Sequence, residues 1–309
     1  MEEKGKVFCI IVTYNAMKWI DKCLTKLQES SLVPAIVVID NCSKDESVSF
    51  IKNKYPQVHI IENKKNRGFG GANNQGIEYA YLNGAEHFFL LNQDAYVHTN
   101  TIDKLVDIQR RTGAELVSPI HLNGNGDLMD CEFFKTFFGG ENNNQICADL
   151  IKGCTKEYYS TTTLINAAAW MLSRKAIEEI GGFDPIFFHY GEDCNYLQRL
   201  HYHKRLPLVV PGCYVNHDRK EHGNMKMYNK QTGTRALLMV YLDINKHHLI
   251  YYVTRHLKDI AKFFIFLFTL NLKKSYYLLR AYFLFFINWP KYRNSRKENR
   301  LLQPNWLQI

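Results

Sequence analysis

Residues 7–15 read Val-Phe-Cys-Ile-Ile-Val-Thr-Tyr-Asn, and this stretch decides the fold class of the chain. Its apolar, β-branched part, residues 7–13, predicts a buried strand. Further strands are predicted at residues 36–39, 59–61 and 87–91, with helices at residues 17–27, 45–54 and 70–82 between them. Because continuous apolar strands that alternate with helices are typical of parallel sheets, we expect a Rossmann-like, mostly parallel central sheet flanked by helices.

The second half of the chain is less regular before the pattern resumes. Residues 122–162 contain the loop signals Asn-Gly-Asn-Gly and Gly-Gly-Glu-Asn-Asn-Asn. After them the sequence predicts strands at residues 163–172 and 208–210 and helices at residues 174–180 and 194–203. Long helical stretches rich in Tyr, Phe and Leu follow. We therefore expect an α/β domain of residues 1–225 and a C-terminal helical region of residues 226–309.

Polar side chains follow the four predicted strands of the N-terminal part. They are Thr13, Tyr14 and Asn15 after the first, Asp40 and Asn41 after the second, Asn66, Arg67 and Gly68 after the third, and Asn92, Gln93 and Asp94 after the fourth. Parallel sheets bind ligands at the carboxyl ends of their strands, where a carboxylate can accept a hydrogen bond from a base or a ribose, or hold a metal ion. Structural alternatives stay open: Asp40 and Asn41 could cap the next helix, residues 92–94 could form an ordinary turn, and Arg67 could be a solvated loop charge.

The glycine-rich segment at residues 68–76 does not indicate a dinucleotide site. It follows the third strand rather than the first, and its spacing does not fit G-x-G-x-x-G. Its glycines still allow the backbone to approach another group closely, and the start of the following helix would favour a phosphate.

The order of these motifs resembles family 2 glycosyltransferases, and within them the rhamnosyltransferase-type branch. The segments that carry the resemblance are Val12-Thr13-Tyr14-Asn15, Ile39-Asp40-Asn41-Cys-Ser-Lys-Asp45, Asn66-Arg67-Gly68-Phe69-Gly70, Leu91-Asn92-Gln93-Asp94, Ala168-Ala169-Trp170-Met171-Leu172-Ser173-Arg174, Gly181-Gly182-Phe183-Asp184 and Phe187-Phe188-His189-Tyr190-Gly191-Glu192-Asp193. It extends over residues 7–240 and rests on their order and spacing, since each motif alone is weak.

This resemblance implies a GT-A fold and an inverting transfer from a nucleotide-diphosphate sugar. It puts Asp40 on the base and Arg67 opposite the diphosphate. The donor-binding set that it implies is Thr13, Tyr14, Asn15, Asp40, Asn41, Arg67, Gly68, Asn92 and Gln93. Residues 92–94 stand where the family has an Asp-x-Asp metal motif, of which only Asp94 is present. Mg²⁺ or Mn²⁺ would bridge Asp94 and the two phosphates.

Displacement at an anomeric carbon needs a base for the proton of the acceptor hydroxyl. By resemblance Asp193 is that base, and Glu192 contacts the acceptor. Because the pair begins a predicted helix, we expect the helix dipole to lower the carboxylate pKa. The alternative is that the pair only caps the helix. For Asp184 we favour a structural role in a turn.

His217, after the strand-like residues 213–216, is expected to complete the metal or diphosphate site, as a histidine does in several proteins of the family. A lone histidine is also often a structural residue, so this alternative stays open. His222 and Arg235 are weaker candidates, Arg235 for a diphosphate contact.

All of the excess positive charge lies in the C-terminal tail. Residues 250–309 hold eleven of the 39 basic residues and only two of the 30 acidic ones, which accounts for the formal net charge of +9. The charge-free runs 263–272 and 281–289 are shorter than the ~20 residues that cross a bilayer. With their aromatic and basic neighbours they are typical of helices that lie at a membrane surface. The alternative is packing on the catalytic domain or a homodimer contact.

The eight cysteines show no C-x-x-C pair and no zinc spacing. The apolar run after the polar N-terminus is too short for the core of a signal peptide. We therefore expect a cytoplasmic protein at the inner face of the cell membrane. There it would build a surface polysaccharide from a dTDP-rhamnose or UDP-hexose donor on a saccharide or lipid-linked acceptor.

Two other classes of function would require sequence features different from those of a sugar transferase. A nucleotidyltransferase acting on sugar phosphates should show a Gly-rich basic loop directly after the first strand, where this chain has Thr-Tyr-Asn-Ala-Met at residues 13–17. A nucleic-acid-binding protein could use the basic tail, but the large apolar runs in that tail favour lipid over a phosphate backbone, so no nucleic-acid partner is expected.

Overall fold

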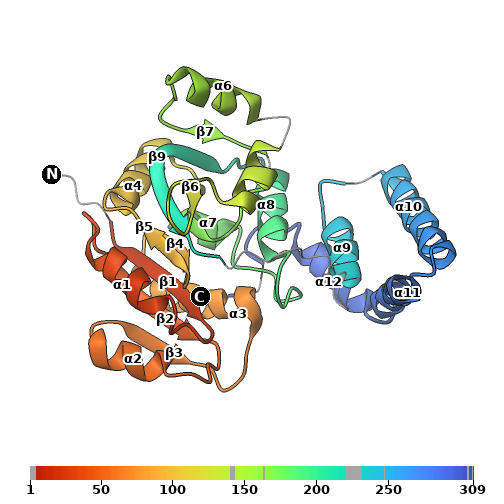
Figure 1. The fold of residues 1–309 in the computed structure, drawn as a ribbon, viewed down its shortest axis with the longest axis horizontal. Coiled ribbons are helices and arrows are strands. Elements are labelled where there is room, and N and C mark those ends of the chain that lie inside the picture. The colour runs from red at the N-terminus through yellow and green to blue at the C-terminus, as the bar shows by residue number, and fades with distance from the viewer. Residues whose placement is uncertain are drawn as a thin grey trace. The chain divides into compact units, whose positions relative to one another are not determined.

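A computed structural model describes residues 5–139, 143–162, 164–219, 232–246, 248–304, 306–307 and 309. The chain forms two compact units, residues 1–220 with 302–309, and residues 221–301 (Figure 1). The expected domain boundary at residue 225 lies outside the described residues. Residues 302–309, which were expected in the C-terminal region, belong instead to the first unit.

The first unit is built on one nine-stranded sheet. Its strands are β1 Val7–Thr13, β2 Ala35–Asp40, β3 His59–Glu62, β4 His87–Asn92, β5 Ala95–Val97, β6 Leu116–Asn123, β7 Tyr159–Ser160, β8 Ala169–Ser173 and β9 Leu208–His217. They follow the order β3-β2-β1-β4-β8-β6-β9-β5, and β7 pairs with β9. The first four strands in this order are parallel. The other half is mixed, because β8 runs antiparallel to both β4 and β6.

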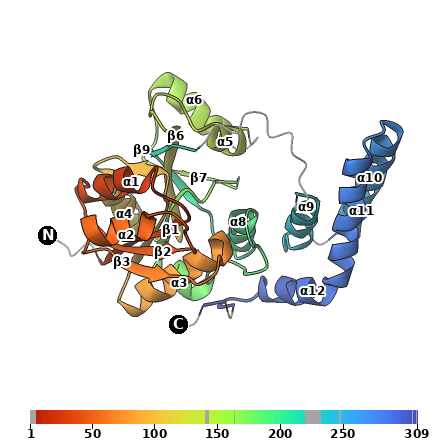
Figure 2. The ribbon, with the colours of Figure 1, turned by 60° about the horizontal axis from the view of Figure 1, so that its bottom comes forward.

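Helices cover both faces of this sheet (Figure 2). They are α1 Ile20–Gln28, α2 Ser47–Lys54, α3 Gly68–Leu82, α4 Thr101–Thr112, α5 Cys131–Phe133, the π-helix η1 Phe134–Phe138, α6 Asn144–Lys152, α7 Arg174–Glu179 and α8 Glu192–Tyr202. Buried residues of α1, α2 and α4 share one core with β1, whereas α3, α7 and α8 contribute to a second core.

The alternation of side chains along β1 explains its unbroken apolar sequence. Cys9 and Ile11 belong to the core with α1 and α4, and Phe8 and Ile10 belong to the core with α3. Since successive side chains of a strand point to opposite faces, a strand covered on both sides needs apolar residues at every position. The predicted buried strand is thereby confirmed.

The start of α2 differs from the prediction for a simple reason. The predicted helix at 45–54 begins only at Ser47, because Oδ1 of Asp45 accepts hydrogen bonds from the Ser47 N–H at 3.1 Å and its hydroxyl at 2.5 Å. An aspartate that bonds the backbone two residues on forms a turn, which precedes the helix here. Helix α4 and strand β6 were not among the predicted elements.

The end of the chain packs on the first unit. The Gln303 N–H donates to the Glu179 carbonyl at 2.8 Å, and Trp306 lies under the guanidinium of Arg199, 4.5 Å from carbon Cζ to the ring centroid. Arg199 is only 1% exposed and donates to the carbonyls of Ile180 and Gly182, each at 2.5 Å. The last residues thus cover a buried arginine.

The second unit contains α9 Thr232–Tyr241, α10 Leu249–Phe268, α11 Leu272–Ile287 and α12 Trp289–Glu298. Helices α10 and α11 are joined by polar contacts to Asp259, which is 3% exposed. Its carboxylate pairs with Arg255 at 3.2 Å and accepts the Tyr282 hydroxyl at 3.1 Å. Among the described residues, no helix combines the length and the apolar character that a bilayer span requires.

Candidate active site

The ends of β1 and β2 meet through Asp40. Its carboxylate accepts hydrogen bonds from the Thr13 hydroxyl at 3.1 Å, the Ser43 hydroxyl at 2.5 Å and the Ser43 N–H at 3.0 Å. Asp40 is 4% exposed. It therefore orders the turn after β2 rather than capping α2, whose N-cap residue is Glu46.

Tyr14 and Asn15 connect β1 to the two neighbouring strand ends. The Tyr14 N–H donates to Oε1 of Gln93 at 2.8 Å, which joins the end of β1 to the end of β4. The Asn15 N–H donates to the Ser43 hydroxyl at 2.9 Å, and its side-chain oxygen accepts the Lys44 N–H at 2.8 Å. The ring of Tyr14 stays about half exposed above these contacts.

Asn41 holds the segment before α3 against the sheet. Its side-chain amide donates to Asn66 Oδ1 at 2.9 Å and to the Gly68 carbonyl at 3.1 Å, and its oxygen accepts the Arg67 N–H at 2.8 Å. The side chain of Arg67 is exposed. Gly68 has a φ of +76°, and a Cβ there would lie 2.0 Å from the Phe188 carbonyl oxygen, so only glycine fits.

Asp94, which follows β4, lies next to His217, the last residue of β9. Residue pairing between β5 and β9 sets Ala95 opposite His217, which brings Nε2 of His217 to 3.3 Å from Oδ1 of Asp94. On the far side of the ring, Nδ1 lies 3.4 Å from Oδ2 of Asp130. Arg219 Nε is 3.1 Å from the same Asp130 oxygen. Two carboxylates and a guanidinium therefore surround one imidazole.

These contacts shift the pKa values of His217, Asp94 and Asp130. Burial would lower the pKa of His217, but its hydrogen bonds to Asp130 and Asp94 outweigh burial and raise it. Burial would raise the pKa of Asp94, but the hydrogen bond and the charge of His217, a backbone hydrogen bond and the charge of Arg219 together outweigh burial and lower it. The pKa of Asp130 is likewise held well below its usual range, against the effect of burial, by His217 and by the N–H of Phe133.

Asp130 and Arg219 are functional candidates that sequence reasoning missed. Asp130 lies in the irregular stretch of residues 122–162, and no local pattern sets it apart from a helix cap, which it also is for α5. Arg219 stands two positions after His217, so its nearness to that residue could have been inferred from the sequence alone.

Asp193 lies in the first turn of α8, which follows Gly191 with a φ of +101°. Its carboxylate accepts the Cys194 N–H at 2.8 Å and a backbone hydrogen bond from Ala167. Burial raises the pKa of Asp193. The expected lowering by the helix dipole is therefore wrong, because removing the carboxylate from water outweighs the partial charge of the helix terminus.

Asp193 faces the same edge as Asp94. The carbonyl of Ala168, next to the Ala167 that bonds Asp193, accepts the Asn92 N–H at 2.9 Å. The charge of Arg219 lowers the pKa of Asp193 and of Asp94, although it is a minor influence in both. The acid of α8 and the strand end before Asp94 are thus linked through residues 167 and 168, and Arg219 influences both carboxylates.

The remaining predicted residues are placed as follows. Glu192 is 4% exposed, and its Cβ lies 3.6 Å from the position that a Cβ on Gly70 would take. Asp184 is 1% exposed and accepts the Ile186 N–H at 2.9 Å, as a turn residue does. His222 lies outside the described residues, and Arg235 lies on α9 of the second unit.

The residues beside Asp94 can take a divalent cation. Oδ1 of Asn92 is buried and has no hydrogen-bond partner in the described part of the chain, and its amide nitrogen lies 3.4 Å from Nε2 of His217. A carboxylate, an amide oxygen and an imidazole nitrogen suit Mn²⁺ better than Mg²⁺, which prefers oxygen alone. No cluster of three His, Cys, Asp or Glu side chains with metal-binding geometry occurs in the described ranges. Phosphate oxygens and water would complete the shell.

A family model described as Glycosyl transferase family 2 matches residues 8–181. The low-salt glycan biosynthesis hexosyltransferase Agl10 of Haloferax volcanii is 26% identical over 203 residues, which are 62% of this chain and 60% of that protein. The dTDP-rhamnosyl transferase RfbF of Shigella flexneri is 29% identical over 124 residues, 38% of this chain and 40% of that protein. The matched region thus spans 60% or less of these two curated relatives.

Among solved structures, that of GalNAc-T7 with UDP, GalNAc and Mn²⁺ superposes with a TM-score of 0.60. The sequence identity is 16%, and the match covers 78% of this chain and 48% of that chain. At this identity the likeness shows the fold alone. That fold is the GT-A type expected from the sequence.

Proposed function

Since this chain belongs to glycosyl transferase family 2, we propose that it transfers a sugar from a nucleotide-diphosphate sugar to a saccharide or lipid-linked acceptor, with inversion at the anomeric carbon. The observation that carries this proposal is the geometry of Asp193. Its carboxylate bonds to Ala167, whose neighbour Ala168 accepts the N–H of Asn92. A carboxylate with a raised pKa thus lies beside the strand end that leads to Asp94, where an acceptor base and a leaving-group site are both needed.

Asp40 supports binding of the donor's base. A carboxylate has about four lone-pair sites, and three hydrogen bonds from Thr13 and Ser43 leave about one free. That site can accept the imide N–H that uracil and thymine share. Because the three internal bonds hold the carboxylate in place, little ordering is needed when the base binds.

The diphosphate would lie between Arg67 and the start of α3. The exposed guanidinium of Arg67 supplies charge-assisted hydrogen bonds, and the N-terminus of a 15-residue helix favours anions. A divalent cation held by Asp94 and His217 would neutralise charge on the leaving diphosphate. Asn92 and Gln93 flank this position.

In the reaction, the acceptor oxygen bonds to the anomeric carbon while the bond from that carbon to the phosphate oxygen breaks. The nucleoside diphosphate leaves, and the hydroxyl proton goes to the carboxylate of Asp193. Burial raises the pKa of Asp193, which makes it a stronger base than an exposed aspartate. Glu192, in the same helical turn, would contact the acceptor.

For the donor we propose dTDP-rhamnose or a UDP-hexose, and for the product a surface polysaccharide. The names of the two relatives, a hexosyltransferase of glycan biosynthesis and a dTDP-rhamnosyl transferase, support both options. We also propose that the enzyme works at the cytoplasmic face of the membrane, which the second unit contacts through its basic and aromatic helices. The membrane contact is tested by flotation of the wild-type protein with anionic and neutral vesicles.

A thermal-shift panel of UDP, dTDP and GDP with and without Mn²⁺, with CMP as the control, tests the donor site. A ligand that binds only the folded state raises the melting temperature by mass action. We expect one nucleotide diphosphate to give a Mn²⁺-dependent shift that Asp94→Ala abolishes. Release of the same nucleotide from its sugar conjugate would then establish transfer, and the absence of a shift with all three would refute the donor site.

A further inference from the structure

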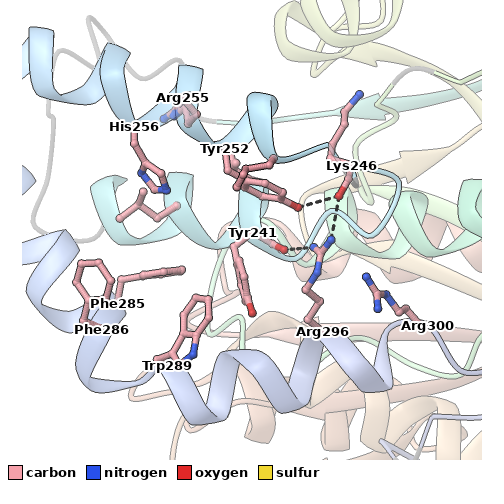
Figure 3. A pocket seen from close by; sticks show the side chains of 13 residues that line it. Tyr241, Lys246, Tyr252, Arg255, His256, Phe285, Phe286, Trp289, Arg296 and Arg300 are labelled. Carbon is pink, nitrogen blue, oxygen red and sulfur yellow. Dashed lines mark hydrogen bonds between the residues drawn. The ribbon is translucent and has the colours of Figure 1, made fainter.

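The second unit contains a cavity of about 370 Å³, a volume within the usual ~300–1,000 Å³ of small-molecule sites. It is enclosed by α9, α10, α11 and α12 and by the chain around Lys246 (Figure 3). Its lining residues are nearly all apolar, aromatic or cationic. They are Leu237, Val240, Tyr241, Lys246, Leu249, Tyr252, Arg255, His256, Phe285, Phe286, Trp289, Arg296 and Arg300. None of them belongs to the candidate active site.

One end of the cavity is cationic. Figure 3 shows Arg296 and Arg300 there, and Lys246 beside Arg296 with its side chain extending away from the two guanidinium groups. Arg296 is held in position by the backbone, because its guanidinium donates to the carbonyl of Tyr241 and to those of Asp243 and Lys246, both at 3.0 Å. Carbonyl groups fix the guanidinium without neutralising it. Its positive charge is therefore a permanent feature of this end of the cavity.

Lys246 and Arg300 are the cations that remain available to a ligand. Both are exposed, and no carboxylate partner of either is found among the residues that the structure describes, although the Lys246 ammonium lies 5.6 Å from the centroid of the Tyr251 ring. Arg255 differs, because it is paired with Asp259 at 3.2 Å. No aspartate or glutamate is found among the described residues that line the cavity. An anion would complement the charge of this end, and the exposed cations Lys246 and Arg300 beside the fixed guanidinium of Arg296 suit a phosphate.

The other end of the cavity is aromatic. Phe285, Phe286 and Trp289 lie there (Figure 3), and the rings of Phe285 and Trp289 are 5.6 Å apart. Phe286 is also 65% exposed, so the apolar end continues into the surface of the unit. Elsewhere on or beside α10 and α11 further apolar side chains are exposed, namely Phe264, Ile265, Phe268, Leu270, Leu272, Phe283 and Ile287. An apolar exposure of this kind marks a site for a hydrophobic partner.

We propose that this cavity binds one anionic lipid. Its phosphate headgroup lies beside Arg300, in front of Arg296 and within reach of the flexible side chain of Lys246, and its hydrocarbon chain runs along Trp289 and Phe286. A free phosphate or a nucleotide would satisfy the cations but leave the aromatic end in contact with water. A neutral lipid would leave the cations without a counter-charge. The proposal refines the membrane contact proposed above and is independent of the transfer reaction.

The test uses the full chain and a short-chain phosphatidic acid kept below its critical micelle concentration, with binding measured by calorimetry. Because no membrane is present, the result separates the cavity from the general membrane contact. Each surface cation near an anionic lipid is worth ~1 kcal/mol, so Lys246→Gln/Arg300→Gln should weaken binding about 30-fold. The matched control Lys291→Gln/Arg293→Gln removes the same charges from exposed positions of α12 that do not line the cavity, and should leave binding within about twofold.

A second pair of variants tests the aromatic end of the cavity. It also provides a test of the proposal if the charge variants fail to fold. Phe286 and Phe283 are 65% and 64% exposed on the same helix, but only Phe286 lines the cavity. Phe286→Ala should weaken binding of the short-chain lipid, and Phe283→Ala should not. Equal losses in the two members of either pair would overturn the proposal, as would competition by inorganic phosphate as strong as that by the lipid. Retained short-chain binding without vesicle flotation would refute the membrane contact and leave the cavity site intact.

Discussion

Nε2 of His217 lies 3.3 Å from Oδ1 of Asp94, although the two residues are far apart in the sequence. The pairing of β5 with β9 brings them together, and Asp130 fixes the ring from its other nitrogen. An imidazole whose second nitrogen is held by a carboxylate is the arrangement that orients a histidine toward a metal. The relationship thus supports the metal site proposed for the leaving diphosphate.

Replacing the proposed base should stop transfer without stopping donor binding. Asp193→Asn keeps the size of the side chain and removes its basicity, so kcat should fall about 10²–10⁴-fold. The dissociation constant of the nucleotide diphosphate should stay close to that of the wild type. The control is Asp127→Asn, an exposed carboxylate in a loop, which should keep full turnover. A fall in donor affinity equal to the fall in kcat would contradict the role as base.

Asp130 should act as a positioning residue for His217. Asp130→Asn leaves a group that can still cap α5 but removes the charged acceptor of the imidazole, so Mn²⁺ should bind about 10–100-fold more weakly in the presence of UDP or dTDP. Titration of the thermal shift with Mn²⁺ measures this affinity. The control is Asp149→Asn. Asp149 is a buried residue of α6, and its carboxylate accepts a hydrogen bond from the Tyr159 hydroxyl. Unchanged Mn²⁺ dependence in Asp130→Asn would rule out the positioning role.

Gly68 should be needed for the loop that leads to Asp193. Gly68→Ala combines a positive φ, costing about 1–2 kcal/mol, with a Cβ 2.0 Å from the Phe188 carbonyl oxygen. We expect a loss of unfolding free energy of about 3 kcal/mol or more in urea, together with lower turnover. Gly113→Ala is the matched control, because Gly113 has a φ of +68° and open space around it. Equal losses in the two variants would show that the contact with Phe188 is not required.

Arg199 should stabilise the first unit from inside. Its burial lowers its pKa to about 10, and Arg199→Met would leave the Ile180 and Gly182 carbonyls without their donor. Each unsatisfied buried group costs about 1–3 kcal/mol, so the unfolding free energy should fall by about 2–5 kcal/mol. Urea unfolding measures the change. Arg174→Met, at a half-exposed arginine paired with Glu178, should cost less than about 1 kcal/mol. Equal effects would show that burial of Arg199 adds nothing.

Much of the polar edge of the sheet could be predicted from the sequence. Parallel strands end at the same edge, so the polar residues after β1, β2 and β4 must approach one another once the strands are recognised. The contacts of Tyr14 with Gln93 and of Thr13 with Asp40 are of this kind. The GT-A fold and the family are confirmed, while the rhamnosyltransferase branch and the roles of the site residues stay predictions.

The approach of Asp130 to His217 could not be read from the sequence. It depends on the path of an irregular segment across the end of β9, and no spacing along the chain encodes that path. The pKa of Asp193 was mispredicted for a related reason, since a helix terminus is visible in a sequence but the burial of its first turn is not. The membership of residues 302–309 in the first unit is a third feature that no local sequence pattern predicts.

The sequence by itself determined the four parallel strands of the first unit, the helices between them and the polar residues at the strand ends, because hydrophobic periodicity and turn chemistry are local properties of the chain. Only the tertiary structure decided which carboxylates meet His217 and that burial raises the pKa of Asp193. It also decided that cations and aromatic rings from four helices of the second unit line one cavity. These outcomes depend on distances and on exclusion of water between residues remote in sequence, which exist only once the chain has packed.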